Sequence, residues 1–441
     1  MSSAVKKEFS SLDLYYKSQC YEVDFSKDYN FERGKVYSIR GNGTSLTAAS
    51  FDKDCTVLQT NNSRKKLFEL DLQNYLLEVS ASTTIMEVYK RLTQEGLCLK
   101  AVPSYPMSTI GGCIAYNAHG QNHTRDGCFA DHVVEMKIIH PSFGEMTLKN
   151  DRDKSIFDLT VNGFGVTGII ISVIIQVYVL PSNRLVVDRM PFKSLIDGYR
   201  YFNQKSKDYD YYHAWFDLNN ISKNKQKGFI ELASYEKNSF FCKEKLKDDY
   251  KEPHHSKIML NIFGSFLMPI ISKLYYWAKI IKKNEVIELF NFIHPSSDKL
   301  FYFSMCGKKG VIEHQILIPH NNVELYLEEF VDLLLKYRPI VPLCHTKIFN
   351  QKSRGMSFTG SGYCLTFHVP VNPNNIEMIS EIDKLDIKYN CIANIIKDSR
   401  LTAEVIRLEY GQLFNDFKVD VMQYDPLRRF SSRIIRRLFE E

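Results

Sequence analysis

A glycine-punctuated stretch from Thr109 to His132 carries the residue types best suited to chemistry. It combines small residues with hydrogen-bonding side chains, and it lies between two strand-like segments. Because glycine has no Cβ, such a loop lets the backbone approach a flat, phosphate-bearing ligand closely. A second glycine turn runs from Arg40 to Thr47. Together the two loops predict a bound dinucleotide, and with it redox chemistry.

The earlier turn, Gly41-Asn42-Gly43-Thr44-Ser45, resembles an anion-binding turn in which successive backbone N–H groups surround phosphate oxygens. It is not the Rossmann fingerprint, because no G-x-x-G/A follows it to open a helix. Gly-x-Gly turns are common, so this one gains weight only from the Thr109 stretch and a third glycine loop, Gly163 to Gly168. Three glycine loops, each beside a strand, favour a cofactor site over simple turns.

The elements that must position these loops can be read from hydrophobic periodicity. Strands are predicted at residues 36–39, 75–80 and 169–179, and a hairpin is predicted from Val133 around a turn at residues 141–144. A helix is expected after Thr84, because Thr84 and Glu87 form a capping-box pattern and apolar residues then recur at helical spacing as far as Gly96.

The bulk composition excludes several classes of protein. Net charge is only +6, and no basic module of the kind that nucleic-acid binders use is present. The ten cysteines are scattered without a CxxC pair or a zinc-like Cys/His spacing, so no metal site is expected. Buried thiols and an N-terminus without the apolar core of a secretory signal favour a reducing, cytoplasmic compartment.

One apolar stretch, Ile258 to Ile271, is too short to span a membrane and is interrupted by Asn261, Gly264 and Pro269. Aromatic and basic residues follow it as far as Lys283. Such a run could lie on a membrane surface, and it could equally be a buried element near a loop.

The glycine loops resemble the PCMH-type FAD-binding domain of the vanillyl-alcohol-oxidase superfamily. Within it the chain is most similar to the decaprenylphosphoryl-β-D-ribose 2-oxidase family, and the similarity runs nearly end to end. The matching motifs are Gly111-Gly112, His119-Gly120-x-Asn122-His123, Asn162-Gly-x-Gly-x-Thr-Gly168, Ala214-Trp-Phe-Asp217, Phe292-x-His-Pro295, Gln315-x-Leu-Ile-Pro319, Lys347-x-Phe349, Lys397-Asp-Ser-Arg400 with Thr402-Ala-Glu404, and Asp425-Pro-Leu-Arg-x-Phe430. The His-Gly and Lys-Asp-Ser-Arg segments are the most specific of these.

The resemblance implies an α+β, two-domain fold. The FAD-binding domain is expected to be split between residues 1–183 and a C-terminal segment, 391–441. A substrate-binding domain built on an antiparallel sheet is expected at residues 184–390. This division agrees with a change in residue composition and pattern after Pro181–Asn183. It also agrees with the last fifty residues, whose pattern is again similar to that of the N-terminal part.

The family's pattern also implies which residues contact the ligands. FAD is expected to contact Ile39, Arg40, Gly41, Asn42, Gly43, Thr44, Ser45, Leu46, Thr47, Ser104, Thr109, Ile110, Gly111, Gly112, Tyr116, Asn117, Ala118, His119, Ile170 and Asn394. The substrate is expected to contact Gln121, Trp215, Gln315, Lys347, Phe349, Cys364, Thr366 and Lys397.

Lys397 and His119 are the expected catalytic residues. Lys397 falls where the family has a lysine beside flavin and substrate, and an ammonium group there would stabilise negative charge on the reduced ring. The alternative for Lys397 is a surface salt bridge to Asp398. His119, with an ordinary pKa near neutral, could orient the flavin, relay a proton or be purely structural. Trp215 could contact the substrate or belong to the core.

Several positions depart from the family's pattern. The first glycine loop has Thr44-Ser45 where many superfamily members attach flavin through a histidine, so non-covalent FAD is expected. Gln121 replaces a lysine, and Asn394 replaces a tyrosine. Thr366 stands at the position of a pocket cysteine, with Cys364 two residues away, and His368 replaces an aspartate. These changes affect the identity of the sugar more than the flavin chemistry.

The resemblance implies oxidation of a secondary sugar hydroxyl, with hydride passing to FAD. A polyprenyl-phosphate-linked pentose in cell-envelope glycan synthesis is the expected substrate, and a partner reductase would complete an epimerisation. A peripheral contact with the inner membrane face would suit a lipid-linked substrate, and arginines 428, 429, 433, 436 and 437 could support it or could simply be solvent charge. The alternatives are a soluble sugar or aldonolactone oxidase using oxygen, and a non-catalytic flavin-binding protein.

Overall fold

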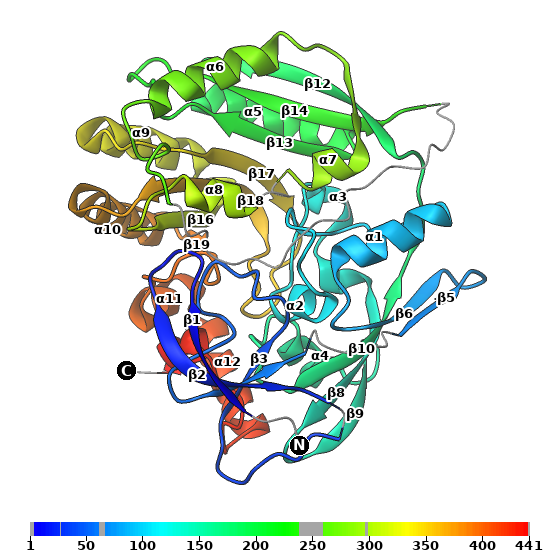
Figure 1. Ribbon diagram of the computed structural model, residues 1–441. Helices are drawn as coiled ribbons and strands as arrows, with labels where there is room; N and C mark the ends of the chain where they lie inside the picture. The colour runs from blue at the N-terminus through cyan, green and yellow to red at the C-terminus, as the bar shows by residue number, and fades with distance from the viewer. Residues whose placement is uncertain (1–3, 27, 61–66, 238–258, 296–298, 440–441) are drawn as a thin grey trace.

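A computed structural model describes residues 4–26, 28–60, 67–237, 259–295 and 299–439, and it mixes helices with largely antiparallel sheets (Figure 1). The described residues up to Val179 form three sheets. The first has the order β1-β2-β4-β3, with β1 at Val5–Ser10, β2 at Lys17–Asp24, β4 at Thr56–Gln59 and β3 at Tyr37–Arg40. The second has the order β5-β6-β10-β8-β9, with β5 at Phe68–Asp71, β6 at Leu76–Ser80, β10 at Ile169–Gln176, β8 at Val133–His140 and β9 at Gly144–Lys149. The third pairs β7 (Leu97–Cys98) with β11 (Tyr178–Val179).

An eight-stranded antiparallel sheet follows, in the order β15-β12-β14-β13-β17-β18-β16-β19. Its strands are β15 at Glu285–Glu288, β12 at Arg184–Phe192, β14 at Gly228–Tyr235, β13 at Tyr211–Phe216, β17 at Cys344–Asn350, β18 at Ser361–Pro370, β16 at Val311–Pro319 and β19 at Ile392–Ala393. Side chains alternate between the two faces of a sheet. One face carries a large apolar cluster that includes Tyr212, Ile316 and Phe367. The other face carries the polar residues described below.

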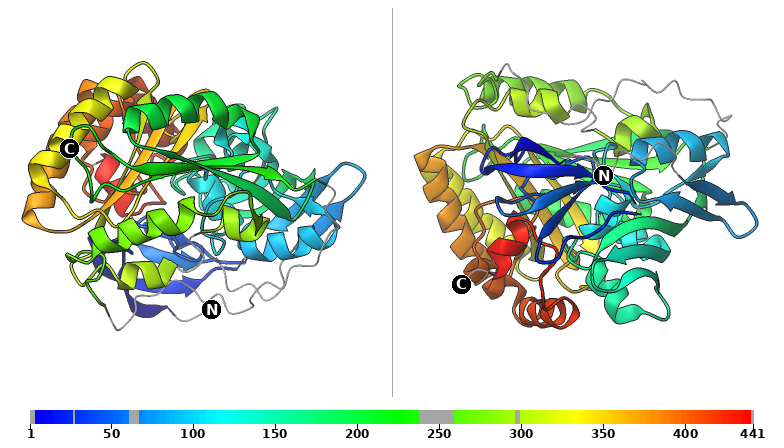
Figure 2. Two further views of the ribbon diagram at one scale, coloured as in Figure 1. Left: turned by 90° about the horizontal axis from the view of Figure 1, so that it is seen from above. Right: turned by 60° about the horizontal axis from the view of Figure 1, so that its bottom comes forward.

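Helices cover the apolar face. These are α5 (Leu195–Lys205), α9 (Val323–Tyr337) and α10 (Pro373–Lys388), which bury Phe202, Phe330 and Ile382 against the sheet. Helix α6 (Met268–Ile280) lies on the opposite side, where Tyr276 packs with Trp215 and Phe229. Figure 2 shows α5 and α6 separated by the strands when the molecule is seen from above.

The remaining helices are short or belong to the ends of the chain: α1 at Ile85–Gln94, α2 at Ile110–Ala115, α3 at His123–Asp126, α4 at Lys154–Thr160, α7 at Leu289–Ile293, α8 at Lys299–Ser304, α11 at Ala403–Tyr410, α12 at Gln412–Tyr424 and α13 at Arg433–Phe439. The C-terminal segment packs on the first sheet (Figure 2). Tyr37 forms a bridge with Phe430, and the Ser38 hydroxyl donates to the carbonyl of Ser431. The domain limits at residues 183 and 391 stay a prediction.

Most predicted local elements are present. The capping box of Thr84 and Glu87 opens α1, and the hairpin predicted from Val133 is formed by β8 and β9. The apolar run at residues 169–179 is divided into β10 and β11, with Val177 between them. The nine cysteines of the described residues are buried and free. No helix in the described ranges is long and apolar enough to cross a membrane.

Candidate flavin and substrate site

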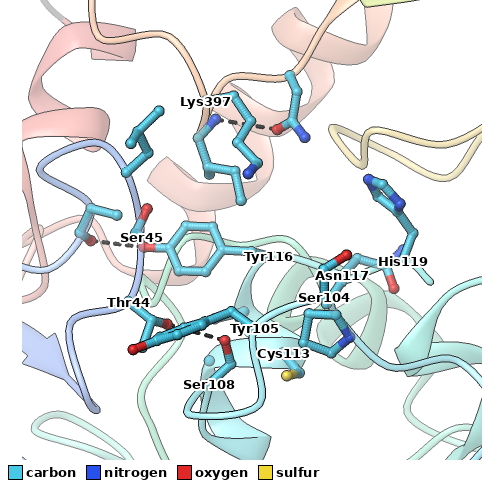
Figure 3. A pocket seen from close by; sticks show the side chains of 18 of the residues that line it. Thr44, Ser45, Ser104, Tyr105, Ser108, Cys113, Tyr116, Asn117, His119 and Lys397 are labelled. Carbon is cyan, nitrogen blue, oxygen red and sulfur yellow. Dashed lines mark hydrogen bonds between the residues drawn. The ribbon is translucent and has the colours of Figure 1, made fainter. Parts of the chain in front are cut away.

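A cavity of about 540 Å³ lies between the glycine loops and the polar face of the eight-stranded sheet. Its volume is in the range of sites for small molecules and cofactors. One wall comes from residues 41–46 and 103–119, and the facing wall comes from β13, β16, β17, β18 and the segment around Lys397. In Figure 3, Lys397 lies across the pocket from Thr44 and Ser108, with His119 to one side.

Close packing joins the first two glycine loops. The Thr44 and Ser108 hydroxyls are 3.1 Å apart (Figure 3). A Cβ on Gly41 would come within 2.5 Å of the Thr109 hydroxyl oxygen, so only glycine allows this approach. Thr109 also caps α2, because its hydroxyl accepts the Gly112 N–H at 3.2 Å. The loops therefore form one continuous, small-residue wall.

A charged group on the polar face of the sheet lines the opposite wall. The ammonium group of Lys397 lies 2.8 Å from one carboxylate oxygen of Glu313, and His368 Nε2 lies 3.2 Å from the other. Nδ1 of His368 is 2.6 Å from the Tyr302 hydroxyl. Burial opposes the ionisation of Glu313, but the neighbouring Lys397 and His368 hold the pKa of its carboxyl well below the usual value. Glu313 is therefore a buried, ionised carboxylate facing the cavity.

Lys347 projects from β17 into the same region and is buried. Burial, followed by the charge of Lys397, lowers the pKa of Lys347 to about 8. Burial and Lys347 also hold the pKa values of His119 and His345 well below 6.5. His119 is thus neutral, and the expectation that its pKa lies near neutral is wrong. A neutral ring in this place is suited to orienting a ligand by a hydrogen bond.

Buried contacts fix the segment that carries Lys397. The guanidinium group of Arg437, in α13, donates to the carbonyls of Ile395 and Asp398 at 2.9 and 2.8 Å, on both sides of Lys397. The Asp398 carboxylate accepts from Arg400 at 2.6 Å and lies 3.5 Å from His314 Nδ1. Asp398 is therefore engaged away from Lys397, and the proposed Lys397–Asp398 surface salt bridge is replaced by the pair with Glu313.

Other C-terminal arginines are also used inside the molecule. Arg429 donates to the carbonyls of Glu32 and Lys35, and Arg436 pairs with Asp52. Arg429 and Arg436 thus hold the C-terminal segment on the N-terminal part, and the membrane contact expected of the C-terminal arginines stays a prediction.

The cavity brings together most of the residues expected from the resemblance. The expected FAD contacts that line it are Ile39, Gly41, Asn42, Gly43, Thr44, Ser45, Leu46, Ser104, Thr109, Gly111, Gly112, Tyr116, Asn117, Ala118, His119, Ile170 and Asn394. The expected substrate contacts that line it are Gln121, Trp215, Gln315, Lys347 and Lys397. Trp215 also stacks on Phe229, so it belongs to the core and to the cavity wall.

Six expected residues do not line the cavity. Arg40 turns to the Ser50 hydroxyl, Thr47 donates to the Ile396 carbonyl, and Ile110 is fully buried in the core. Phe349 stacks on the His123 ring at 3.7 Å, and Cys364 packs in a small apolar cluster. Thr366 lies beneath Gln315 and accepts a hydrogen bond from its amide at 2.7 Å. Thr366 can influence the cavity only by orienting Gln315, whose carbonyl oxygen accepts from Asn394.

Glu313, His345 and Tyr302 were not among the site residues predicted from the sequence, and His368 was noted there only as a departure from the family's pattern. The alternation of side chains along a strand could have identified Glu313 and His345, because every second residue faces the same side of the sheet. Gln315 and Lys347 were expected in the site, so Glu313 and His345, two residues earlier on the same strands, had to face it as well. Tyr302 comes from α8, and no periodic pattern relates it to the site.

The residues of the cavity fit FAD. Among the described residues, the buried polar atoms without a hydrogen-bond partner include Ser45 Oγ, His119 Nδ1 and Gln121 Oε1, and all three side chains line the cavity. Buried polar atoms are normally paired, so these atoms indicate a polar ligand. The small-residue wall suits a flat ring and its phosphates, and Lys397 supplies positive charge opposite.

Comparison with known proteins agrees with this geometry. The family model of the FAD binding domain matches residues 28–147. A decaprenylphosphoryl-β-D-ribose oxidase of Mycolicibacterium smegmatis is 26% identical over 387 residues, covering 85% of this chain and 83% of that protein. A D-lactate dehydrogenase of Anaerostipes hadrus is 23% identical over 36% of this chain and 34% of its own length. An L-galactono-1,4-lactone dehydrogenase of Oryza sativa subsp. japonica is 28% identical over 25% of this chain and 19% of its own length.

The FAD-binding match covers the first two glycine loops, and the first of these relatives covers the strands that carry the polar sheet face. This chain is an FAD-dependent oxidoreductase that resembles the decaprenylphosphoryl-β-D-ribose oxidase family.

Proposed function

We propose that this oxidoreductase oxidises a secondary hydroxyl group of a sugar, and that the sugar is a pentose linked to a polyprenyl phosphate. The observation that carries the proposal is the Lys397–Glu313–His368 group, which faces the glycine loops across the cavity. It places a cation and a proton acceptor beside the region that fits a flavin. Lys347 is a second cation that lines the cavity, and we propose it as the partner of the carrier phosphate.

When bound, FAD supplies an acceptor for the hydride that leaves the carbinol carbon. As the C–H bond breaks, the hydroxyl proton becomes strongly acidic, so even a carboxylate of low pKa can accept it. Glu313 is the carboxylate that lines the described cavity, and Lys397 and His368 hold it in place. Lys397 also presents positive charge where negative charge develops. Gln315 and Asn394, bonded to each other, can orient the sugar.

The direct test is anaerobic bleaching of the flavin by candidate substrates. We expect polyprenyl-phosphate pentoses to reduce the bound flavin, and the product to be the 2-keto sugar. Release of hydrogen peroxide with a free sugar or an aldonolactone as the preferred substrate would support the oxygen-using oxidase instead. A flavin that stays oxidised with every sugar, although it is bleached by dithionite, would support a non-catalytic role.

We further propose that FAD is held without a covalent bond. The first glycine loop offers Thr44 and Ser45 in place of a histidine, and the nearby Cys113 is fully buried, which raises the pKa of its thiol far above the ordinary value. A protonated thiol is a poor nucleophile. Acid precipitation is therefore expected to release all of the yellow colour into the supernatant. Flavin fluorescence that stays with the washed pellet would contradict this expectation.

Lys347 makes the binding of a phosphate-bearing substrate dependent on pH. The Lys347 ammonium is present below its pKa of about 8 and is lost as the pH rises through this value. We expect KM for a polyprenyl-phosphate sugar to rise by about tenfold for each pH unit above 8, with little change in kcat. A Lys347→Met variant should have a high KM at every pH. A free sugar without phosphate provides the control, and its KM should be flat over the same range. An equal rise for both substrates would exclude this role.

Two partners belong to the proposal. A reductase would return the keto sugar as its epimer, and an inner membrane surface on the cytoplasmic side would present the lipid-linked substrate. The first is tested by adding a nicotinamide-dependent reductase fraction and following the epimer. The second requires a membrane-binding surface on this chain.

A further inference from the structure

Helix α6 is apolar on two opposite sides. Its inner side buries Met268, Ser272 and Tyr276 against β12 and β14. Its outer side exposes large apolar residues at helical spacing: Leu267, Ile270, Leu274, Trp277 and Ile281, with Phe266 just before them. Phe266 is 81% exposed, Leu274 65% and Ile281 74%. A helix on the surface of a globular protein normally carries polar residues on its outer side, so the outer side of α6 needs another explanation.

The charged residues of the segment that carries this stripe are all lysines. Residues 258–284 contain four lysines, at positions 273, 279, 282 and 283, and no aspartate or glutamate. Lys279 and Lys282 pair with Glu231 and Glu285. Lys273 and Lys283 are exposed, and no ion pair to the described residues is formed by either. The outer side of α6 is therefore an apolar stripe, with a tryptophan, bordered by cations.

The stripe is next to the candidate active site. Tyr275, on the same helix, lines the cavity and lies edge-to-face with Trp215 at 5.1 Å. Figure 1 shows α6 at the outer edge of the molecule, beyond the strands β12 and β14. A surface that covers α6 would thus lie beside the cavity.

We infer that the outer side of α6 docks on an anionic lipid bilayer, with the helix lying in the plane of the interface. Apolar side chains on one side of a helix, lysines at its border and an interfacial tryptophan are the features of such helices. The lysines are complementary to anionic headgroups and not to a second positively charged copy of the same stripe. This inference deepens the proposed function, since it identifies the surface that would receive a lipid-linked substrate.

Binding to vesicles tests the inference without any turnover. The full-length protein is expected to sediment with vesicles of phosphatidylcholine mixed with phosphatidylglycerol, and much less with phosphatidylcholine alone. A Leu274→Asp, Ile281→Asp variant should lose the binding. A Lys273→Gln, Lys283→Gln variant should bind roughly 30-fold more weakly. Leu408→Asp is the matched control, because Leu408 is exposed to a similar degree on α11, and it should bind as the parent does.

Each other outcome overturns the inference. Absence of binding to anionic vesicles, or binding that survives the α6 substitutions, would exclude α6 as the lipid surface. A dimer in solution that the Leu274→Asp, Ile281→Asp variant dissociates would assign the stripe to a second copy of this chain. The proposed function is tested separately, by bleaching of the flavin with a water-soluble, short-chain prenyl-phosphate sugar. Bleaching without vesicle binding leaves the function standing and removes the membrane surface. Vesicle binding without bleaching keeps the membrane surface and removes the proposed function.

Discussion

Replacing Lys397 with alanine is expected to leave FAD bound and to slow flavin reduction by roughly 100- to 1000-fold. Lys397 is the cation that faces the glycine loops from the tail of the chain, and its partner Glu313 lies 2.8 Å away. The ammonium group stabilises the negative charge that develops as hydride is transferred, so its removal acts on the rate of reduction more than on binding of the cofactor. The measurement is anaerobic stopped-flow absorbance with substrate in excess.

Lys384→Ala provides the control for Lys397→Ala. Lys384 is exposed and pairs with Glu381 on the surface of α10, so its loss should leave the rate of reduction unchanged. The flavin content and the melting temperature of both variants should match the parent protein. A Lys397→Ala protein that retains FAD and is reduced at the parent rate would remove Lys397 from the reaction.

A Glu313→Gln substitution is expected to lower kcat by about 100-fold, the lower end of the effect of a general base. Glutamine keeps the shape of the side chain and can still accept a hydrogen bond from Lys397, but it cannot take up the hydroxyl proton. The pKa of Glu313 is held well below its usual value by Lys397 and His368, so the carboxylate is ionised throughout the neutral range. Activity that depends on it should therefore be lost only at strongly acidic pH.

Two further variants separate chemistry from structure at this position. Glu313→Asp retains a carboxylate and should recover part of kcat, whereas a purely structural role would leave it no better than glutamine. Glu324→Gln removes an exposed carboxylate paired with Arg200 and serves as the control. If Glu313→Gln lowers the melting temperature but leaves the rate of flavin reduction unchanged, Glu313 only supports the fold.

The sequence predicted the glycine loops well, because their information is local. Gly41 and Thr109 approach each other so closely that a side chain at position 41 would collide with the Thr109 hydroxyl, and residue type alone reveals such a constraint. The same holds for the capping box that opens α1. Residue type and spacing are enough to recognise loops of this kind, and the family model confirms the FAD-binding interpretation of residues 28–147.

The sheet wall of the cavity was predicted less well, because it depends on which neighbours cover a side chain. Cys364 and Thr366 share the polar face of β18 with His368, yet only His368 lines the cavity. Thr366 is covered by Gln315, and Cys364 is covered by apolar neighbours that include Phe358. The match to the family's motifs placed Cys364 and Thr366 in the predicted site and left out Glu313. The alternation of side chains along β16 would have added Glu313 to the predicted site. However, only the packed structure reveals which side chains on the same face of a strand are covered by neighbouring residues.

Arg437, in the short helix α13, donates hydrogen bonds to the chain on both sides of Lys397. This helix therefore helps to hold the Lys397 side chain in place. Its seven residues, of which Ile434, Ile435 and Leu438 are buried in the core, help to place the ammonium group of Lys397, although none of them lines the cavity. Fraying of that terminus would switch the chemistry off while leaving the glycine loops, and hence the yellow colour, intact. Tags or fusions placed there therefore risk producing a coloured but inert protein.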